Sequence, residues 1–299
     1  MALWDIFRIR GYKRTIAALK KENADLSAKL AELKYDDYAQ VKARIDEITH
    51  QTEQYEKNFE FFKQNQEKIL RVREFLADDL SKKIFDNVIL YKLTGKINYL
   101  FDAECERADS FSLINASKIK SFADLGAYRG DTLSEMLNYA PTLECAYALE
   151  PDAKTYKKLL AFCEGYSRNV KLYPKNIAAW SENTTLIFNS SSNRNSGAFA
   201  PTTNAKTIEI TADSLDNILV GKPIDHIKYD VEGAEKQAIE GSKFTITNFA
   251  PSLTVSVYHR SEDIFEIPLQ IHNLNKDYKL YLRRYPYVPA WDIELICIK

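Results

Sequence analysis

The sequence predicts an α/β fold, in which a Rossmann-like, seven-stranded sheet with an antiparallel C-terminal hairpin follows an α-helical, coiled-coil N-terminal region. From Ser121 onward, short apolar runs alternate with helical stretches, which is typical of a parallel sheet covered by helices. The last two apolar runs have no helix between them, which favours an antiparallel pair at the sheet edge. Before Pro141 there is no proline, and only Gly11 and Gly95 interrupt the first 125 residues, so long helices are expected there.

Three segments are expected along the chain: a helical coiled-coil region over 1–70, accessory linking helices over 71–118, and a catalytic domain over 119–299. A heptad spacing relates the apolar residues of the first helix, with Asn23 at the one polar core position; they are Ile16, Leu19, Leu26, Leu30 and Leu33. A lone core Asn often selects a parallel dimer. The register breaks near residues 35–40, which indicates a bent helix or a two-helix hairpin. Self-association and intramolecular packing both remain open.

The seven expected strands of the main sheet cover residues 121–125, 145–150, 170–173, 226–231, 252–258, 279–285 and 293–299. A further pair of strand-like runs, TTLIFN and KTIEIT, flanks a loop rich in Asn and Ser over residues 189–204. Such a loop is either a closing element over substrate or a disordered connection.

The turn after the first strand, FADLGAYRGDT over residues 122–132, indicates which cofactor the sheet receives. A dinucleotide fingerprint needs G-x-G-x-x-G, so that the backbone can approach a pyrophosphate. Here Tyr128 and Asp131 occupy the second and third glycine positions, and a carboxylate at the helix start repels a phosphate. The turn therefore predicts a cofactor with an adenosine and no phosphate, of which S-adenosylmethionine is the common one. The turn residues expected to bind it are Asp124, Gly126, Ala127, Tyr128, Gly130, Asp131 and Thr132.

A second acid, Glu150, follows the second strand and supports this interpretation. A carboxylate at this position can accept both hydroxyls of a ribose. Asn176, after the third strand, and Asp230, after the fourth, complete the expected cofactor-binding set. An ordinary helix cap or a solvated turn acid remains the alternative for Asp131 and Glu150.

Polar side chains converge where the fourth and fifth strands end, because ligands of open parallel sheets bind beyond the carboxyl ends of the strands. Asp230 and Glu232 follow the fourth strand, and His259 follows the fifth. His259 has a pKa near neutrality when unperturbed and is a candidate general base, with Asp230 orienting it or accepting the proton itself. Asp230, Glu232 and His259 would also be the ligands of a divalent metal, if one is present. A structural hydrogen bond is the alternative role for His259.

The candidate substrate contacts are Tyr258, Arg260 and Arg283. Arg260, Arg283 and Arg284 could meet a phosphate or uronate group, or could equally pair with neighbouring acids at the surface.

Composition narrows the expected partners and location. The net charge is −1 and the basic residues are dispersed, which argues against nucleic acid. No run approaches the roughly 18 apolar residues of a membrane span, no signal peptide is evident, and the four cysteines lack a CxxC spacing, so a reducing, cytoplasmic location is expected. The opening LWDIFRIRGYKR could rest on a membrane surface or dock on a partner, although helix packing is favoured.

Five ordered motifs, DLGAYRGDT, ALEPD, IDHIKYDVEGAE, VSVYHRSEDIFEIP and YLRRY, resemble the FkbM-type methyltransferases. The resemblance covers about residues 90–299 and implies an S-adenosylmethionine-dependent O-methyltransferase, of a family often placed among genes for glycans or polyketides. It implies that Gly126 and Gly130 line the cofactor, that Glu150 holds the ribose, and that Asp230 and Glu232 face the reaction centre. The expected acceptor is a sugar hydroxyl of a bacterial surface glycan or its precursor.

Two other functions remain open. One is a catalytically weak assembly component, whose helical region binds a glycan-synthesising partner. The other is an NAD-dependent oxidoreductase, which Tyr128, Asp131 and the closing hairpin disfavour. For the methyltransferase and the assembly component alike, a peripheral membrane or glycan-assembly partner and a homo-oligomer through the N-terminal helices are possible.

Overall fold

The computed structural model describes residues 10–30, 35–166, 169–189, 207–286 and 292–299. The chain divides into two compact units, Met1–Glu74 with Lys82–Ala103, and Phe75–Ser81 with Glu104–Lys299. Residues 104–118, expected among the linking helices, pack in the second unit. There α7 (Arg107–Leu113) contacts strand β10 (Ile293–Ile298), and the short η1 (Ala116–Lys118) contacts α7 and α8 (Asp131–Tyr139).

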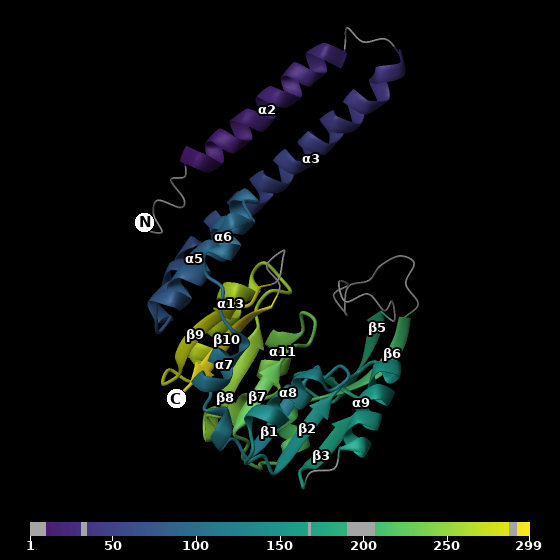
Figure 1. Cartoon of the computed structure of the whole chain (residues 1–299), viewed down its shortest axis with the longest axis vertical. Helices are drawn as coiled ribbons and strands as arrows, with labels where there is room; N and C mark the ends of the chain where they lie inside the picture. The colour runs from purple at the N-terminus through teal and green to yellow at the C-terminus, as the bar shows by residue number, and fades with distance from the viewer. Residues whose placement is uncertain (1–9, 31–34, 167–168, 190–206, 287–291) are drawn as a thin grey trace. The chain divides into compact units, whose positions relative to one another are not determined.

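The first unit is helical. Its helices are α2 (Arg10–Leu30), α3 (Tyr35–Gln64), most of α4 (Gln66–Phe75), most of α5 (Asp79–Thr94) and α6 (Asn98–Phe101). α2 and α3 run antiparallel and side by side (Figure 1), so the interrupted heptad forms a two-helix hairpin. The polar core residue Asn23 donates to the hydroxyl of Thr49 across the pair, at 2.7 Å. Intramolecular packing thus satisfies the residue that could have selected a parallel dimer.

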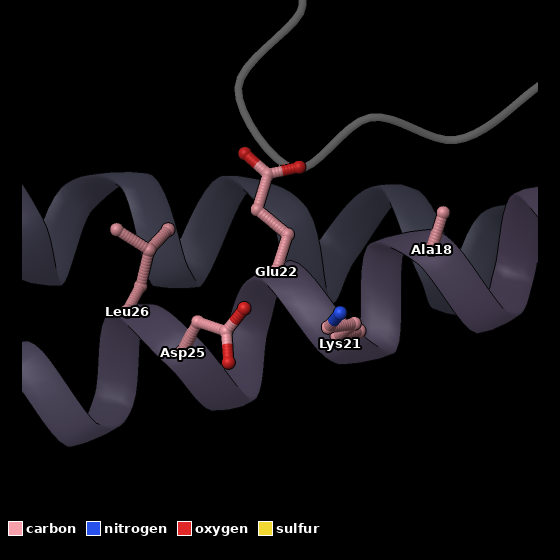
Figure 2. Close-up of a pocket in the computed structure, with 5 residues that line it drawn as sticks. All are labelled: Ala18, Lys21, Glu22, Asp25 and Leu26. Atoms are coloured by element: carbon pink, nitrogen blue, oxygen red, sulfur yellow. The ribbon is translucent and has the colours of Figure 1, made fainter.

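A shallow hollow lies on α2 and is lined by Ala18, Lys21, Glu22, Asp25 and Leu26 (Figure 2). Charged side chains of both signs form most of this lining, and the residues expected to bind cofactor or substrate lie in the other unit. The hollow therefore gives no indication of a ligand. Of the helices that the structure describes, none combines the length and apolar character needed to cross a membrane.

The second unit contains the predicted sheet, with strand order β3-β2-β1-β7-β8-β10-β9 (Figure 1). The strands are β1 (Ser121–Leu125), β2 (Cys145–Leu149), β3 (Lys171–Lys175), β7 (His226–Tyr229), β8 (Ser252–Ser256), β9 (Lys279–Arg284) and β10 (Ile293–Ile298). The five strands from β3 to β8 are parallel, whereas β10 pairs antiparallel with both β8 and β9. The predicted C-terminal hairpin is confirmed.

Helices join the parallel strands and cover the sheet. They are α8 (Asp131–Tyr139), α9 (Ala153–Gly165), α10 (Leu215–Leu219), α11 (Glu235–Glu240), α12 (Lys243–Phe249) and α13 (Asp263–Leu274). All four residues of β7 are buried, as expected for a central strand covered on both faces. A core cluster that includes Leu133, Met136 and Leu159 packs α8 and α9 against the sheet.

The additional strand pair is also present: β5 (Thr184–Asn189) and β6 (Thr207–Asp213) are antiparallel, and β6 pairs with the short β4 (Ala178–Ala179). The loop expected to close over substrate lies largely outside the described residues. All four cysteines are free thiols; Cys105 and Cys297 are buried, and Cys145 and Cys163 are half-buried.

Candidate active site

The glycine turn after β1 lies directly against the end of β7. Gly126 has a φ of +88°, and a Cβ added there would lie 1.9 Å from the backbone oxygen of Asp230. Gly130 has a φ of +93° and precedes the first residue of α8, Asp131, whose side chain is exposed. Both glycines are therefore required by backbone conformation, and Gly126 also by the close approach of two strand ends.

Glu150 joins this turn to the loop after β2. One carboxylate oxygen accepts a hydrogen bond from the N–H of Tyr128, at 3.0 Å, and the other accepts from the N–H of Asp152, at 2.8 Å. Burial raises the pKa of Glu150 to about 7, although both N–H groups oppose the shift. The side-chain amide of Asn176 donates to the backbone oxygens of Glu150 and Pro151 and fixes the same loop. Each oxygen of Glu150 keeps a lone pair for a further donor.

Asp124, the last acid of β1, is fully buried, and neither of its oxygens accepts a hydrogen bond from the described residues. Burial raises its pKa to about 6, even though the neighbouring Lys228 opposes the shift. Buried carboxylates without partners are costly. This unsatisfied group fits a site that receives a cationic ligand.

Lys228, in the middle of β7, is a site residue that the sequence analysis missed. Its ammonium group is buried and lies 3.0 Å from one oxygen of Asp230. The signal in the sequence was a lysine between Ile227 and Tyr229 in the short strand HIKY. Burial raises the pKa of Asp230, but Lys228 and His259 outweigh this effect and lower it to about 2. Asp230 is therefore ionised, and its other oxygen accepts from the hydroxyls of Ser256, at 2.9 Å, and Tyr258, at 3.3 Å.

His259 lies among three carboxylates. Its Nδ1 is 2.9 Å from Glu235, and its Nε2 is 3.5 Å from Glu232 and 3.7 Å from Asp230. Burial lowers its pKa, but the acids, Glu235 foremost, raise it to about 9. The expectation that His259 keeps a near-neutral pKa suited to a general base is therefore corrected, because these acids stabilise the imidazolium.

Glu235, the first residue of α11, is the second functional residue that the sequence analysis missed. It is fully buried, and one of its oxygens accepts from the N–H groups of Val231, at 2.9 Å, and Gly233, at 3.3 Å. A helix-initiating acid is common, so its sequence context gave no signal of contact with His259.

The arginines predicted to bind substrate are placed differently from one another. Arg260 is exposed beside Gly233, near the acids. Arg283 is buried, with its guanidinium 2.7 Å from Asp78, and Arg284 pairs with Glu104 at 3.0 Å. These last two pair with acids, as the alternative had it, but both are buried and do not lie at the surface. We therefore leave Arg283 out of the proposed substrate site.

Comparison with known proteins decides the family. The family model described as the methyltransferase FkbM domain matches residues 124–288, which is more than half of the 299-residue chain. The chain belongs to the FkbM methyltransferase family. The match begins at Asp124 and includes the glycine turn, Glu150, Asp230 and His259, so the resemblance expected from the sequence motifs is confirmed.

A solved structure of an FkbM methyltransferase shows the same fold. The crystal structure of the FkbM methyltransferase from Methylobacillus flagellatus KT superposes with a TM-score of 0.63 at 21% identity, covering 79% of this chain and 59% of that chain. The present chain thus spans less than two thirds of the length of that protein.

Two further matches are more distant. A precorrin-6y C5,15-methyltransferase from Geobacter metallireducens GS-15 gives a TM-score of 0.39 at 14% identity, covering 64% of this chain and 85% of that chain. An rRNA methylase from Streptococcus thermophilus gives a TM-score of 0.41 at 12% identity, covering 64% of this chain and 94% of that chain. A search of curated proteins found no match.

Proposed function

We propose that this methyltransferase uses S-adenosylmethionine and methylates the oxygen of a sugar hydroxyl, in the biosynthesis of a bacterial surface glycan. The family supports methyl transfer. The observation that favours a hydroxyl acceptor is the cluster of Asp230, Glu232 and His259 beside the glycine turn. A hydroxyl group must lose its proton during methyl transfer, and this cluster offers anionic acceptors for that proton.

The residues at the turn fit the proposed cofactor. S-adenosylmethionine would supply an activated methyl group on a positively charged sulfonium. Glu150 retains acceptor capacity for ribose hydroxyls, and the unpartnered carboxylate of Asp124 favours a cation nearby. Tyr128 and Asp131 stand where a dinucleotide site would need glycines, which disfavours a pyrophosphate.

Within the cluster, Asp230 is the group best held for contact with an acceptor. Lys228 and Ser256 fix its carboxylate from two sides, and the hydroxyl of Tyr258 lies against it. We propose that Asp230 accepts a hydrogen bond from the acceptor hydroxyl and orients its oxygen, while the neighbouring acids stabilise the departing proton. Arg260, which is exposed next to these acids, would contact an acidic group of the substrate.

The proposal is tested with S-adenosylmethionine labelled in the methyl group and a panel of acceptors: sugar nucleotides, lipid-linked sugars, a catechol and a transfer RNA. Label should appear in a sugar as an alkali-stable methyl ether, and Asp230→Asn should slow transfer about 100-fold or more. Label released by mild alkali, or found only in the catechol or the RNA, would overturn the choice of acceptor. Absence of transfer combined with tight binding of a glycan-synthesising protein would support an assembly role instead.

The helical unit lies outside the family match. We propose that it serves as a partner-binding or self-association element of a cytoplasmic enzyme, since α2 and α3 carry charges of both signs, whereas a nucleic-acid-binding element concentrates basic residues.

A further inference from the structure

The Nε2 atom of His259 faces two carboxylates at distances that hydrogen bonds do not explain. The separations are 3.5 Å to Glu232 and 3.7 Å to Asp230, whereas a charge-assisted hydrogen bond is about 2.7 to 2.9 Å long. Two ligands of one metal ion, each about 2.1 to 2.3 Å from it, lie about 3.0 to 3.8 Å apart. Nε2 therefore lies at a ligand-to-ligand spacing from each of the two carboxylates.

The other ring nitrogen of His259 is held as it is in metal sites. Metal-bound histidines almost always direct the second nitrogen at a carboxylate or a backbone oxygen, which fixes the ring. Here Nδ1 is 2.9 Å from the fully buried Glu235, which two backbone N–H groups hold in place. The ring is thus oriented from behind, with Nε2 presented to the exposed side of the cluster, where Glu232 lies.

The charges of the cluster also call for a cation. Asp230, Glu232 and Glu235 contribute three carboxylates, and the cationic groups facing them are the ammonium of Lys228, which pairs with Asp230, and the imidazolium of His259. The second oxygen of Glu235 is buried and accepts no hydrogen bond from the described residues. Among those residues, Asp230, Glu235 and His259 form the one group whose possible ligand atoms all lie within 4.8 Å of one another.

We propose that His259 and Asp230 bind one divalent cation, that the exposed side chain of Glu232 turns towards it as the third ligand, and that Glu235 positions the imidazole without ligating the ion. The cation would replace the weak contact of Tyr258 with Asp230, at 3.3 Å. Two carboxylates and one imidazole suit Mn²⁺ or Mg²⁺. Beside the acceptor hydroxyl, the cation would favour loss of the hydroxyl proton, and this role rests on the proposed function. Binding of the cation does not depend on the proposed function.

The test is a titration of the metal-free full chain with Mn²⁺ alone, in which free Mn²⁺ is followed by electron paramagnetic resonance. One site per chain is expected, and Mg²⁺ should compete for it. Glu232→Gln and His259→Ala should each weaken Mn²⁺ binding about tenfold or more, and Glu235→Gln should weaken it about 10- to 100-fold. Glu232 is exposed, so Glu232→Gln should fold, and a thermal melt checks this.

Glu240→Gln is the matched control, because Glu240 is an exposed acid of α11 paired only with Lys243 at the surface in the described part of the chain. It removes the same charge and should leave Mn²⁺ affinity unchanged. The proposal is overturned if the wild type binds no Mn²⁺, if Glu232→Gln binds like wild type, or if Glu240→Gln loses as much affinity. Binding of S-adenosylmethionine in chelator is measured separately, so loss of the metal site alone leaves the proposed methyl transfer standing.

Discussion

The carboxyl group of Asp124 is fully buried at the end of β1 and lacks a hydrogen-bond partner among the described residues. Its folded-state pKa of about 6 lies above the ordinary 3.8, with burial as the main cause. The stability linked to this shift is fully present below pH 3.8 and is lost as the pH rises through 6. Two pKa units correspond to about 3 kcal/mol, which is the order of the cost of the ionised group at pH 8.

Asp124→Asn removes this pH-dependent cost. We expect the free energy of unfolding to rise relative to wild type at pH 8, by up to about 3 kcal/mol, and the gain to shrink towards pH 4. Urea unfolding of both proteins at pH 8 and at pH 4 measures the difference in unfolding free energy. An equal difference at the two pH values would show that the Asp124 carboxylate is not destabilised by burial. The same variant should bind S-adenosylmethionine more weakly.

Glu150→Ala should weaken binding of S-adenosylmethionine about 10- to 100-fold, because charge-assisted hydrogen bonds to the ribose are lost together with the support of the Tyr128 turn. Calorimetric titration measures the affinity. Glu164→Ala removes an exposed acid of α9 and serves as the control. Equal affinities for the two variants would remove Glu150 from the cofactor site.

The sequence was informative at the residue scale where a residue type and its place at a strand end suffice. Glu150, Asp230 and His259 were predicted on that basis, and the structure places Glu150 against the turn and Asp230 beside His259. Lys228 and Glu235 were missed because their importance depends on which side chains the fold brings within 3 Å of them. Arg283 was assigned to substrate because its partner, Asp78, lies about 200 residues earlier in the chain.

At the scale of elements, the turn between β1 and α8 depends on backbone space rather than on side chains. Gly126→Ala places a methyl group at a φ of +88° and within 1.9 Å of the backbone of Asp230. We expect a loss of at least about 2 kcal/mol of unfolding free energy, measured by urea denaturation.

Gly165→Ala is the control for this change, since an added Cβ there meets no described atom within 4 Å. It should be neutral or slightly stabilising. If both variants unfold at the same urea concentration, the close approach of the two strand ends has no energetic role.

The order and type of the elements followed from periodicity, and the seven strands lie where the apolar runs predicted. The exact ends of the strands were not predicted from periodicity. Strands β2, β7 and β8 end one or two residues before the predicted boundary, at Leu149, Tyr229 and Ser256. The residues beyond these ends, Glu150, Asp230 and Tyr258, carry the polar contacts of the site. The end of a strand depends on where its backbone stops pairing with neighbouring strands, which residue type alone does not specify.

For the whole molecule, the division into a helical unit and an α/β unit was predicted from the distribution of proline and glycine. The sequence alone left open whether the N-terminal helices pair within the chain, because a heptad pattern is equally compatible with both arrangements. The contact of Asn23 with Thr49 shows pairing within the chain. The acceptor stays a proposal, since the fold and the family specify the reaction class more closely than the substrate.

The most direct test of the account is equilibrium binding of S-adenosylmethionine and of NAD to the full chain at pH 8, by calorimetric titration. The account predicts saturable binding of one S-adenosylmethionine per chain and no measurable binding of NAD, because Tyr128 and Asp131 leave no cradle for a pyrophosphate. Binding of NAD, or failure of S-adenosylmethionine to bind to folded protein, would contradict it.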